Sequence, residues 1–268
     1  MDSHLSTNRA HWNERVPLHR DSAFYDLASF KAGRSSLKSI EREELGAVAD
    51  KSLLHLQCHF GLDTLSWARL GADVTGADFS DEAIALAQSL SAELAIPARF
   101  VCANLYDLPQ VLTEQFDIVF TSGGVLVWLP DIQRWAEVIA HFLRPGGTFY
   151  IREHHPFSKV FDNTGAAPQP QLAYPYFDRE PTRWESSGSY ATSHAETVHN
   201  VHYEWQHTLG DIVTALIANG LRLENLHEFP FVGWKCLPGM EQGEDGWWRL
   251  AGREAHLPLM FSIRATKG

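Results

Sequence analysis

The stretch LLHLQCHFGLDTLSWARLGADVTGADFS, residues 53–80, decides the fold. It begins with the short apolar run Leu53–Leu56, passes through a turn that ends in Gly61, and continues with apolar residues at helical spacing. A second apolar run then ends at Asp78. A strand, a tight turn, a helix and a second strand with an acid at its end form the pattern of a nucleotide-binding βαβ unit.

The turn of this unit reads Gln57-Cys58-His59-Phe60-Gly61, and only its last residue is glycine. A dinucleotide pyrophosphate needs close approach to the backbone, which is why loops that bind NAD or FAD are rich in glycine. A ligand without phosphates tolerates side chains better. The turn therefore argues against NAD and FAD and is compatible with S-adenosylmethionine (SAM), while the carboxylate of Asp78 can accept both hydroxyls of a ribose. The alternative is a Rossmann-like turn that binds no ligand.

Strands and helices alternate from residue 50 to residue 155, which predicts a doubly wound α/β fold with a mostly parallel sheet and helices on both faces. Residues 156–205 then break the pattern, because they are rich in proline, glycine, serine and aromatic residues and have no clear period. We expect this segment to be an insertion and not an independent domain. Regularity returns with a helix that begins at Thr208 and with two further strands.

The composition excludes several classes of partner. The 268 residues carry a formal net charge of −11 without a run of basic residues, which argues against nucleic acid. The three cysteines form no CxxC pair, which favours a reducing compartment. The N-terminus has no apolar signal region and no stretch is long enough to span a membrane, so we expect a cytoplasmic protein without a membrane partner.

Five blocks of the sequence, taken in order, resemble the class I SAM-dependent methyltransferases of the bacterial small-molecule type. The blocks are LLHLQCHFGLDT (53–64), VTGADFS (74–80), RFVCANLYDLP (99–109), FDIVFTSGGVLVWLPD (116–131) and LRPGGTFYIREHHP (143–156). The resemblance implies a seven-stranded sheet whose last strand is antiparallel. It also implies a helical arm or lid at residues 1–49 and a SAM-binding domain at 50–268 with the insertion at about 156–205. The implied activity is transfer of a methyl group from SAM to a small molecule.

The same resemblance assigns cofactor positions. The turn after the first strand approaches the methionine part of SAM, Asp78 takes the ribose, and Asn104 faces the adenine where the family often has an aspartate. Asn104 can both donate and accept, so it suits that place. The full set of implied cofactor-binding residues is Tyr25, Gln57, Cys58, His59, Gly61, Asp63, Asp78, Phe79, Asn104, Leu105, Thr121, Ser122 and Gly123. Cys58 and Phe79 have an alternative role as buried packing residues.

The acceptor side is less specified. A base assists methyl transfer when the acceptor carries a proton, and we predict His155, at the end of the fifth strand, as the first candidate and His207 as the second. Either histidine can instead be structural. No histidine pair has the spacing of a known metal motif, so no metal is predicted. Four aromatic residues are expected to wall the acceptor pocket: Trp128, Tyr190, Trp205 and Trp234. Trp12 and Tyr25 are expected to belong to the lid.

Two alternatives remain open at this stage. One is a nicotinamide-dependent oxidoreductase with an altered loop, and the other is a SAM-binding protein that has lost its catalytic activity. A methyltransferase that modifies nucleobases is disfavoured, because the fourth strand ends in TSGG and the net charge is negative. The sequence leaves undecided whether the methyl group goes to oxygen, nitrogen or sulfur, and a homodimer is possible.

Overall fold

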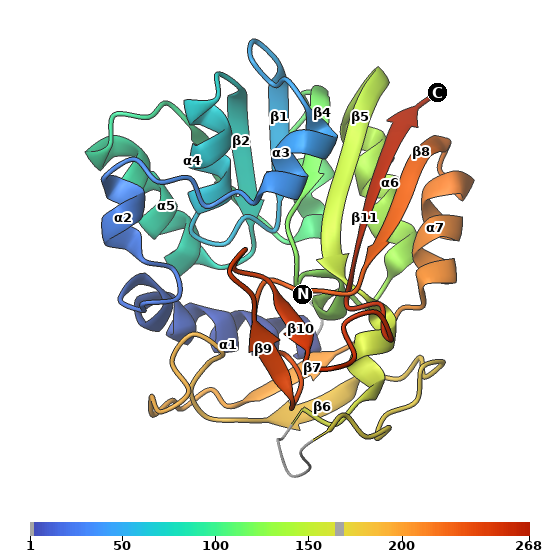
Figure 1. Cartoon of the computed structure of the whole chain (residues 1–268). Helices are drawn as coiled ribbons and strands as arrows, with labels where there is room; N and C mark the ends of the chain where they lie inside the picture. The colour runs from blue at the N-terminus through green and yellow to red at the C-terminus, as the bar shows by residue number, and fades with distance from the viewer. Residues whose placement is uncertain (1–2, 164–168) are drawn as a thin grey trace.

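A seven-stranded sheet forms the centre of the computed structural model, which describes residues 3–163 and 169–268 (Figure 1). The strands are ordered β3-β2-β1-β4-β5-β11-β8. Pairs from β3 to β5 are parallel, and β11 runs antiparallel to both of its neighbours. The strands span β1 Ser52–Leu56, β2 Asp73–Asp78, β3 Arg99–Cys102, β4 Phe116–Thr121, β5 Leu143–His154, β8 Leu221–Phe229 and β11 Met260–Lys267. The predicted mostly parallel sheet with an antiparallel last strand is confirmed.

Helices cover both faces of this sheet, as the alternation of the sequence predicts (Figure 1). The α-helices are α1 Ser3–Arg20, α2 Leu27–Lys31, α3 Ser39–Leu45, α4 Leu62–Arg69, α5 Asp81–Glu93, α6 Ile132–Phe142 and α7 Leu209–Ala218. Three short 3-10 helices follow strand ends: η1 Leu105–Gln110, η2 Leu126–Trp128 and η3 Pro156–Val160. Several of the α-helices and 3-10 helices begin with a side-chain cap. The hydroxyl of Ser80, for example, accepts from the N–H of Ala83 at the start of α5.

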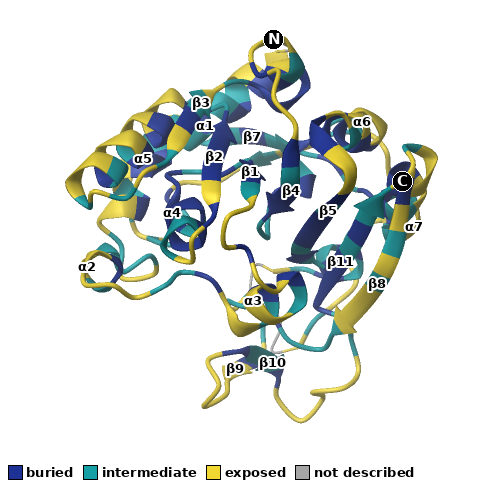
Figure 2. Cartoon of the chain, turned by 90° about the horizontal axis from the view of Figure 1, so that it is seen from above, coloured by how far each residue is buried: buried dark blue, intermediate teal, exposed yellow. Residues whose placement is uncertain are grey.

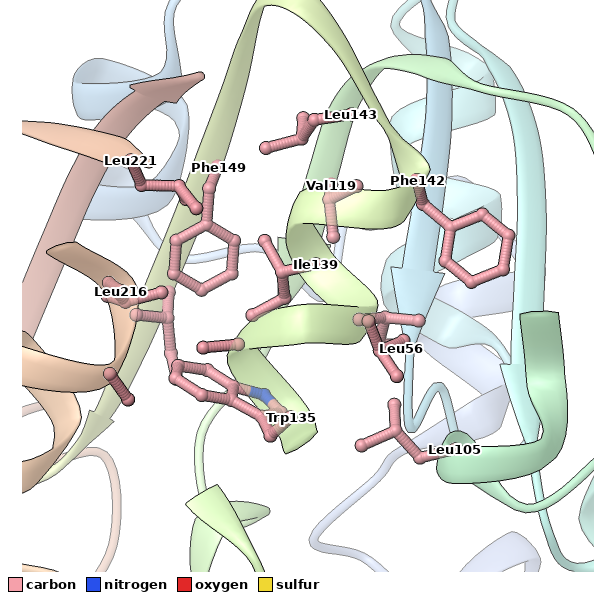
Figure 3. Close-up of a cluster of buried hydrophobic side chains, with 14 of the residues drawn as sticks. Leu56, Leu105, Val119, Trp135, Ile139, Phe142, Leu143, Phe149, Leu216 and Leu221 are labelled. Carbon is pink, nitrogen blue, oxygen red and sulfur yellow. The ribbon is translucent and has the colours of Figure 1, made fainter. Parts of the chain in front are cut away.

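Alternation along each strand divides the core into layers on the two faces. On β4, Val119 belongs to the cluster under α6 and α7, whereas Phe120 packs with Trp67 of α4 on the other face. Figure 3 shows Phe149 and Trp135 in the first of these clusters, where both side chains are fully buried. Figure 2 shows that buried residues concentrate in the central strands, while the outer edges of α5 and β8 are exposed.

A further layer lies across the carboxyl edge of the sheet (Figure 1). It consists of α1, a two-stranded sheet from the predicted insertion, β6 Thr182–Glu185 with β7 Val201–Glu204, and a second hairpin-like pair, β9 Met240–Gln242 with β10 Trp248–Leu250. Both pairs are antiparallel. In the part of the chain that the structure describes, no helix has the length and apolar character needed to cross a membrane.

Polar side chains of α1 join this helix to the insertion. The amide of Asn8 donates to the carbonyl of Tyr203 and accepts from its N–H, each at 2.8 Å, as a neighbouring strand would. Arg15, of which only 3 % is exposed, donates to the carbonyls of His199 and Ser186. A buried guanidinium is costly unless its donors are satisfied, and here carbonyls of the insertion satisfy them. α1 and the insertion are therefore held together and form one cover over the sheet edge.

We expect Phe149→Ala to lower the free energy of unfolding by about 3–5 kcal/mol, because it removes a fully buried ring from the centre of the core. Urea unfolding followed by circular dichroism measures this change. Val111→Ala is the control, since Val111 is 56 % exposed and its truncation should stay within about 0.5 kcal/mol. A loss below about 1 kcal/mol for Phe149→Ala would contradict this description of the core.

Candidate functional site

A cavity of about 890 Å³ lies between the carboxyl edge of the sheet and the cover formed by α1 and the insertion. Its floor comes from the loops that follow β1, β2, β4 and β5, and its roof includes Trp12, Tyr25 and Tyr190. Ligands of open α/β sheets bind outside the carboxyl ends of the strands. The cavity therefore occupies the position at which this architecture places its ligand.

The loop after β1 has a left-handed backbone at two residues that are not glycine. Gln57, His59 and Gly61 all have positive φ, at 56°, 51° and 79°. At Gly61 a Cβ atom would lie 2.7 Å from the ring of Phe100, so glycine is required there. The other two positions keep the same left-handed conformation with large side chains, at a cost of roughly 1–2 kcal/mol each. The loop thus preserves a glycine-type shape although two of its glycines are absent.

Asp78 closes this loop onto β2. Its Oδ2 accepts from the N–H of His59 and its Oδ1 from the N–H of Ser80, each at 2.9 Å. The carboxyl group is 8 % exposed and borders the cavity, and burial raises its pKa to about 6 against the opposing effect of the backbone N–H groups. Each oxygen keeps a second acceptor position, so the group can bind two hydroxyls of a ligand.

Aromatic rings from the cover lie directly over the loop. His19 Nδ1 is 2.9 Å from His59 Nε2, and burial lowers the pKa of both rings. Both are therefore neutral, and one donates to the other. Tyr25 stacks on His19 and its hydroxyl bonds to that of Tyr190 from the insertion. Two distant segments thus meet above the loop.

A second buried carboxylate holds the loop after β4. Glu153, at the end of β5 and 4 % exposed, accepts from the N–H groups of Gly124 at 2.5 Å, Val125 at 2.8 Å and Leu126 at 3.1 Å. A carboxylate that receives three N–H groups fixes the backbone of this loop. Sequence reasoning missed Glu153, because its role depends on N–H groups of the loop after β4, which reach the end of β5 only in the folded sheet.

Most of the predicted cofactor residues line the cavity. On the adenine side predicted from the sequence, Asn104 also accepts from the N–H of Tyr106 and so begins η1. Cys58 is 4 % exposed and burial raises the pKa of its thiol, which fits the alternative of a packing residue. Lining residues from the predicted set are Tyr25, Gln57, Cys58, His59, Gly61, Asp63, Asp78, Phe79, Asn104, Leu105, Ser122 and Gly123. Thr121 is fully buried and lies outside the lining.

The expectation that His155 faces this crevice is wrong. Its Nδ1 accepts from the N–H of Phe157, its Nε2 lies 2.9 Å from Oε1 of Glu228 on β8, and it is absent from the cavity lining. The chain direction at the end of β5 instead brings the neighbouring His154 into the cavity. His207 does border the cavity, but its Nε2 lies 2.7 Å from the carbonyl of Leu129 and donates to it.

The remainder of the cavity combines aromatic walls with charged groups. The aromatic residues predicted to wall the acceptor pocket, Trp128, Tyr190, Trp205 and Trp234, all line it. Polar groups that sequence reasoning missed lie among them, chiefly His154, Lys159 and Glu204. They come from η3, β7 and the end of β5, which are far apart in the chain, so no spacing pattern announces them. Among residues 3–163 and 169–268, no three histidine, cysteine or acidic side chains gather as a metal-binding group.

The central part of the chain is similar to known methyltransferases. Residues 54–151 match a family model described as a methyltransferase domain. A ubiquinone biosynthesis O-methyltransferase of Photorhabdus laumondii is 32 % identical over 106 residues, which are 40 % of this chain and 44 % of that protein. One from Chromobacterium violaceum is 30 % identical over 142 residues, 53 % of this chain and 59 % of the relative. The chain thus spans about half the length of the curated relatives it matches.

Solved structures show the same fold over most of the chain. An S-adenosylmethionine-dependent methyltransferase from Mesorhizobium loti superimposes with a TM-score of 0.58 at 20 % identity, covering 88 % of this chain and all of that one. A methyltransferase described as S-adenosylmethionine-dependent from Listeria monocytogenes gives a TM-score of 0.57 at 19 % identity, covering 90 % of this chain and 99 % of that one. At these identities the likeness extends to the fold alone.

Acid should weaken the cover over the loop. Burial lowers the pKa of His11 and His19 from 6.5 to about 3, so the unfolded chain binds more protons than the native state below pH 6.5. We expect the free energy of unfolding to fall by up to about 1.4 kcal/mol per pH unit for each such histidine as the pH drops from 6.5 toward 3. The raised pKa of Asp78 has the opposite effect. Between pH 6 and the ordinary aspartate pKa of 3.8, the free energy of unfolding gains a contribution from Asp78 as the pH falls.

Urea unfolding between about pH 7 and pH 5 measures this dependence, with His19→Gln expected to flatten it relative to wild type. His141→Gln is the matched control, because His141 is an exposed residue on α6. An equal slope in wild type and His19→Gln would show that His19 does not remain neutral in the folded protein.

Proposed function

We propose that this chain, which carries a domain of the methyltransferase family within the class I SAM-dependent methyltransferase fold, transfers a methyl group from SAM to a small molecule. The observation that carries the proposal is the joint between the loop 57–61 and Asp78. It lies in the matched segment 54–151, borders the large cavity and presents a buried carboxylate with spare acceptor positions.

The residues at this joint fit SAM. Asp78 would hold the ribose hydroxyls, with Phe79, Asn104 and Leu105 beside the adenine. The Oε1 atom of Gln57 is a buried acceptor that lacks a hydrogen-bond partner among the described residues, which suits the ammonium group of the methionine part. When bound, SAM supplies a methyl group already activated by its sulfonium. The chain then has to orient the two reactants and exclude water.

A small-molecule acceptor is supported by the shape of the site. The cover of α1 and the insertion lies over the cavity, and aromatic rings wall its interior. The cavity volume falls in the range of sites for small ligands. The relatives named as O-methyltransferases act in ubiquinone biosynthesis, which supports oxygen as the acceptor atom here.

The oxidoreductase alternative is less well supported. The side chains of Gln57 and His59 occupy positions at which a pyrophosphate requires bare backbone. A protein that binds SAM without transferring its methyl group has the same cofactor site, and turnover separates the two.

Calorimetric titration with SAM, S-adenosylhomocysteine (SAH) and NADH tests the cofactor. We expect the first two to bind and NADH to remain silent. Asp78→Ala should weaken SAH binding by about 1.5–3 kcal/mol, because it removes charge-assisted hydrogen bonds. Asp73→Ala is the control, since Asp73 is an exposed acid at the other end of β2. Binding of NADH in place of SAH would favour the oxidoreductase.

The affinity for SAH should also depend on pH through Asp78. Its pKa of about 6 means that the carboxyl group of the free protein becomes protonated below pH 6 and then loses acceptor capacity. We expect the dissociation constant for SAH to rise up to about tenfold per pH unit below that value. Asp78→Asn should bind more weakly at pH 7 and show less of this dependence. A pH-independent affinity in wild type would contradict the assignment.

A further inference from the structure

We propose that the acceptor is an aromatic hydroxyl compound, with Glu204 as the group that receives its proton and Lys159 as the group that holds its oxygen. This inference rests on the proposed function and assigns the acceptor end of the same cavity. Both side chains line that cavity, Lys159 from η3 and Glu204 from the end of β7.

The two charged groups are close but do not bond directly. Lys159 Nζ lies 3.7 Å from Glu204 Oε2, beyond the length of a direct hydrogen bond, and the side chains are 34 % and 21 % exposed. A hydroxyl group between them can donate its proton to the carboxylate and accept a bond from the ammonium. The pair is therefore spaced to receive one group that is both donor and acceptor.

Glu204 is distinguished from the other carboxylates of the cavity by its bonding. Asp78 and Glu153 are held by backbone N–H groups, and Asp63 accepts from the hydroxyl of Ser36 at 2.5 Å. Within residues 3–163 and 169–268, the Glu204 carboxylate has only long ion-pair contacts, to Lys159 and, at 3.8 Å, to His202 on its own strand. Burial lowers the pKa of His202, which leaves Lys159 as the charged neighbour.

The histidines of the cavity are poorly suited to act as the base. The indole N–H of Trp234 donates to Nε2 of His154 at 3.0 Å, so that nitrogen is occupied. Burial further lowers the pKa of His154 to about 3. His207 donates from its Nε2 to the carbonyl of Leu129, which ties its ring to the backbone. Among the acids that line the cavity in the described chain, Glu204 is the one held by neither a backbone N–H nor a hydroxyl group.

The pair also lies on the side of the cavity where the two reactants would meet. Trp205 follows Glu204 in the chain, and its backbone N–H donates to the carbonyl of Val127 at 2.8 Å. Val127 lies in the turn that follows Ser122 and Gly123. Lys159 lies near enough to His154 to lower the pKa of that ring, and a Cβ at Gly124 would be 4.0 Å from the same ring. The loop after β4 and the charged pair thus face one space.

Hydrogen-bonding capacity selects among acceptor classes. A protonated amine can donate to Glu204 but cannot accept from Lys159, and a carboxylate can accept from Lys159 but has no proton to give Glu204, whereas a hydroxyl does both. The walls of Trp128, Trp205 and Trp234 favour a planar ring. In the transfer, a bond forms between the acceptor oxygen and the methyl carbon while the carbon–sulfur bond breaks, its electron pair stays on sulfur, and the hydroxyl proton goes to Glu204.

The test uses the SAH complex of the full chain titrated with catechol, benzylamine and benzoate. We expect catechol to bind more tightly than the other two, and Lys159→Met to weaken its binding by about tenfold or more, with partial recovery in Lys159→Arg. Glu204→Gln should retain catechol binding within about threefold but lower methyl transfer from SAM to catechol by about a hundredfold. Glu185→Gln, an exposed acid of β6, is the matched control.

Each result decides the inference. Preferred binding of benzylamine or benzoate, or undiminished transfer in Glu204→Gln, would overturn it, as would binding of SAH without binding of any of the three probes. Unchanged SAH affinity in the variants shows that they are folded. Failure of wild type to bind SAH would overturn the proposed function, and this inference with it, so the two failures are distinguishable.

Discussion

Two buried carboxylates hold the loops on which the site depends, and they do so in the same way. Asp78 ends β2 and binds a backbone N–H of the loop after the neighbouring β1, and Glu153 ends β5 and binds three N–H groups of the loop after the neighbouring β4. Charge-assisted bonds to backbone N–H groups are strong where water is excluded. Each loop is therefore positioned by the adjacent strand, and both loops contribute to the floor of the cavity.

This arrangement explains how the loop after β1 tolerates unusual residues. The shape of a glycine-rich loop usually comes from the conformational freedom of glycine. Here Gln57 and His59 have the same left-handed backbone. His59 is bonded at its N–H to Asp78 and at its ring to His19, and the side chain of Gln57 donates to the carbonyl of Val125. The side chains that replace glycine thereby become part of the site. His59 joins the loop to α1, and Gln57 brings a polar group into the cavity.

Hydrogen bonds of polar side chains hold the cover over the cavity together, and the histidines packed in and under the cover are uncharged. Asn8 and Arg15 fasten α1 to the backbone of the insertion, while His11, His19 and His59 are kept neutral by burial. Neutral rings can pack on aromatic neighbours and still exchange hydrogen bonds, which a buried imidazolium could do only at a large desolvation cost. The packing of the cover is consequently sensitive to protonation of these rings, and charged side chains such as Lys159 and Glu204 line the cavity beside it.

The amino-acid sequence by itself determined the fold and which loop residues meet at the carboxyl edge of the sheet, because both depend on local patterns. Apolar periodicity sets each strand and helix, and parallel strands bring their carboxyl ends to one edge, so Asp78, Asn104 and Ser122 had to lie together. The tertiary structure alone decided which histidine faces the cavity. His154 and His155 are adjacent, and the course of the chain after β5 turns His154 inward and leaves His155 against Glu228. It also decided the pairing of Lys159 with Glu204, since contacts between segments so distant in the chain arise only when the insertion packs on the sheet edge.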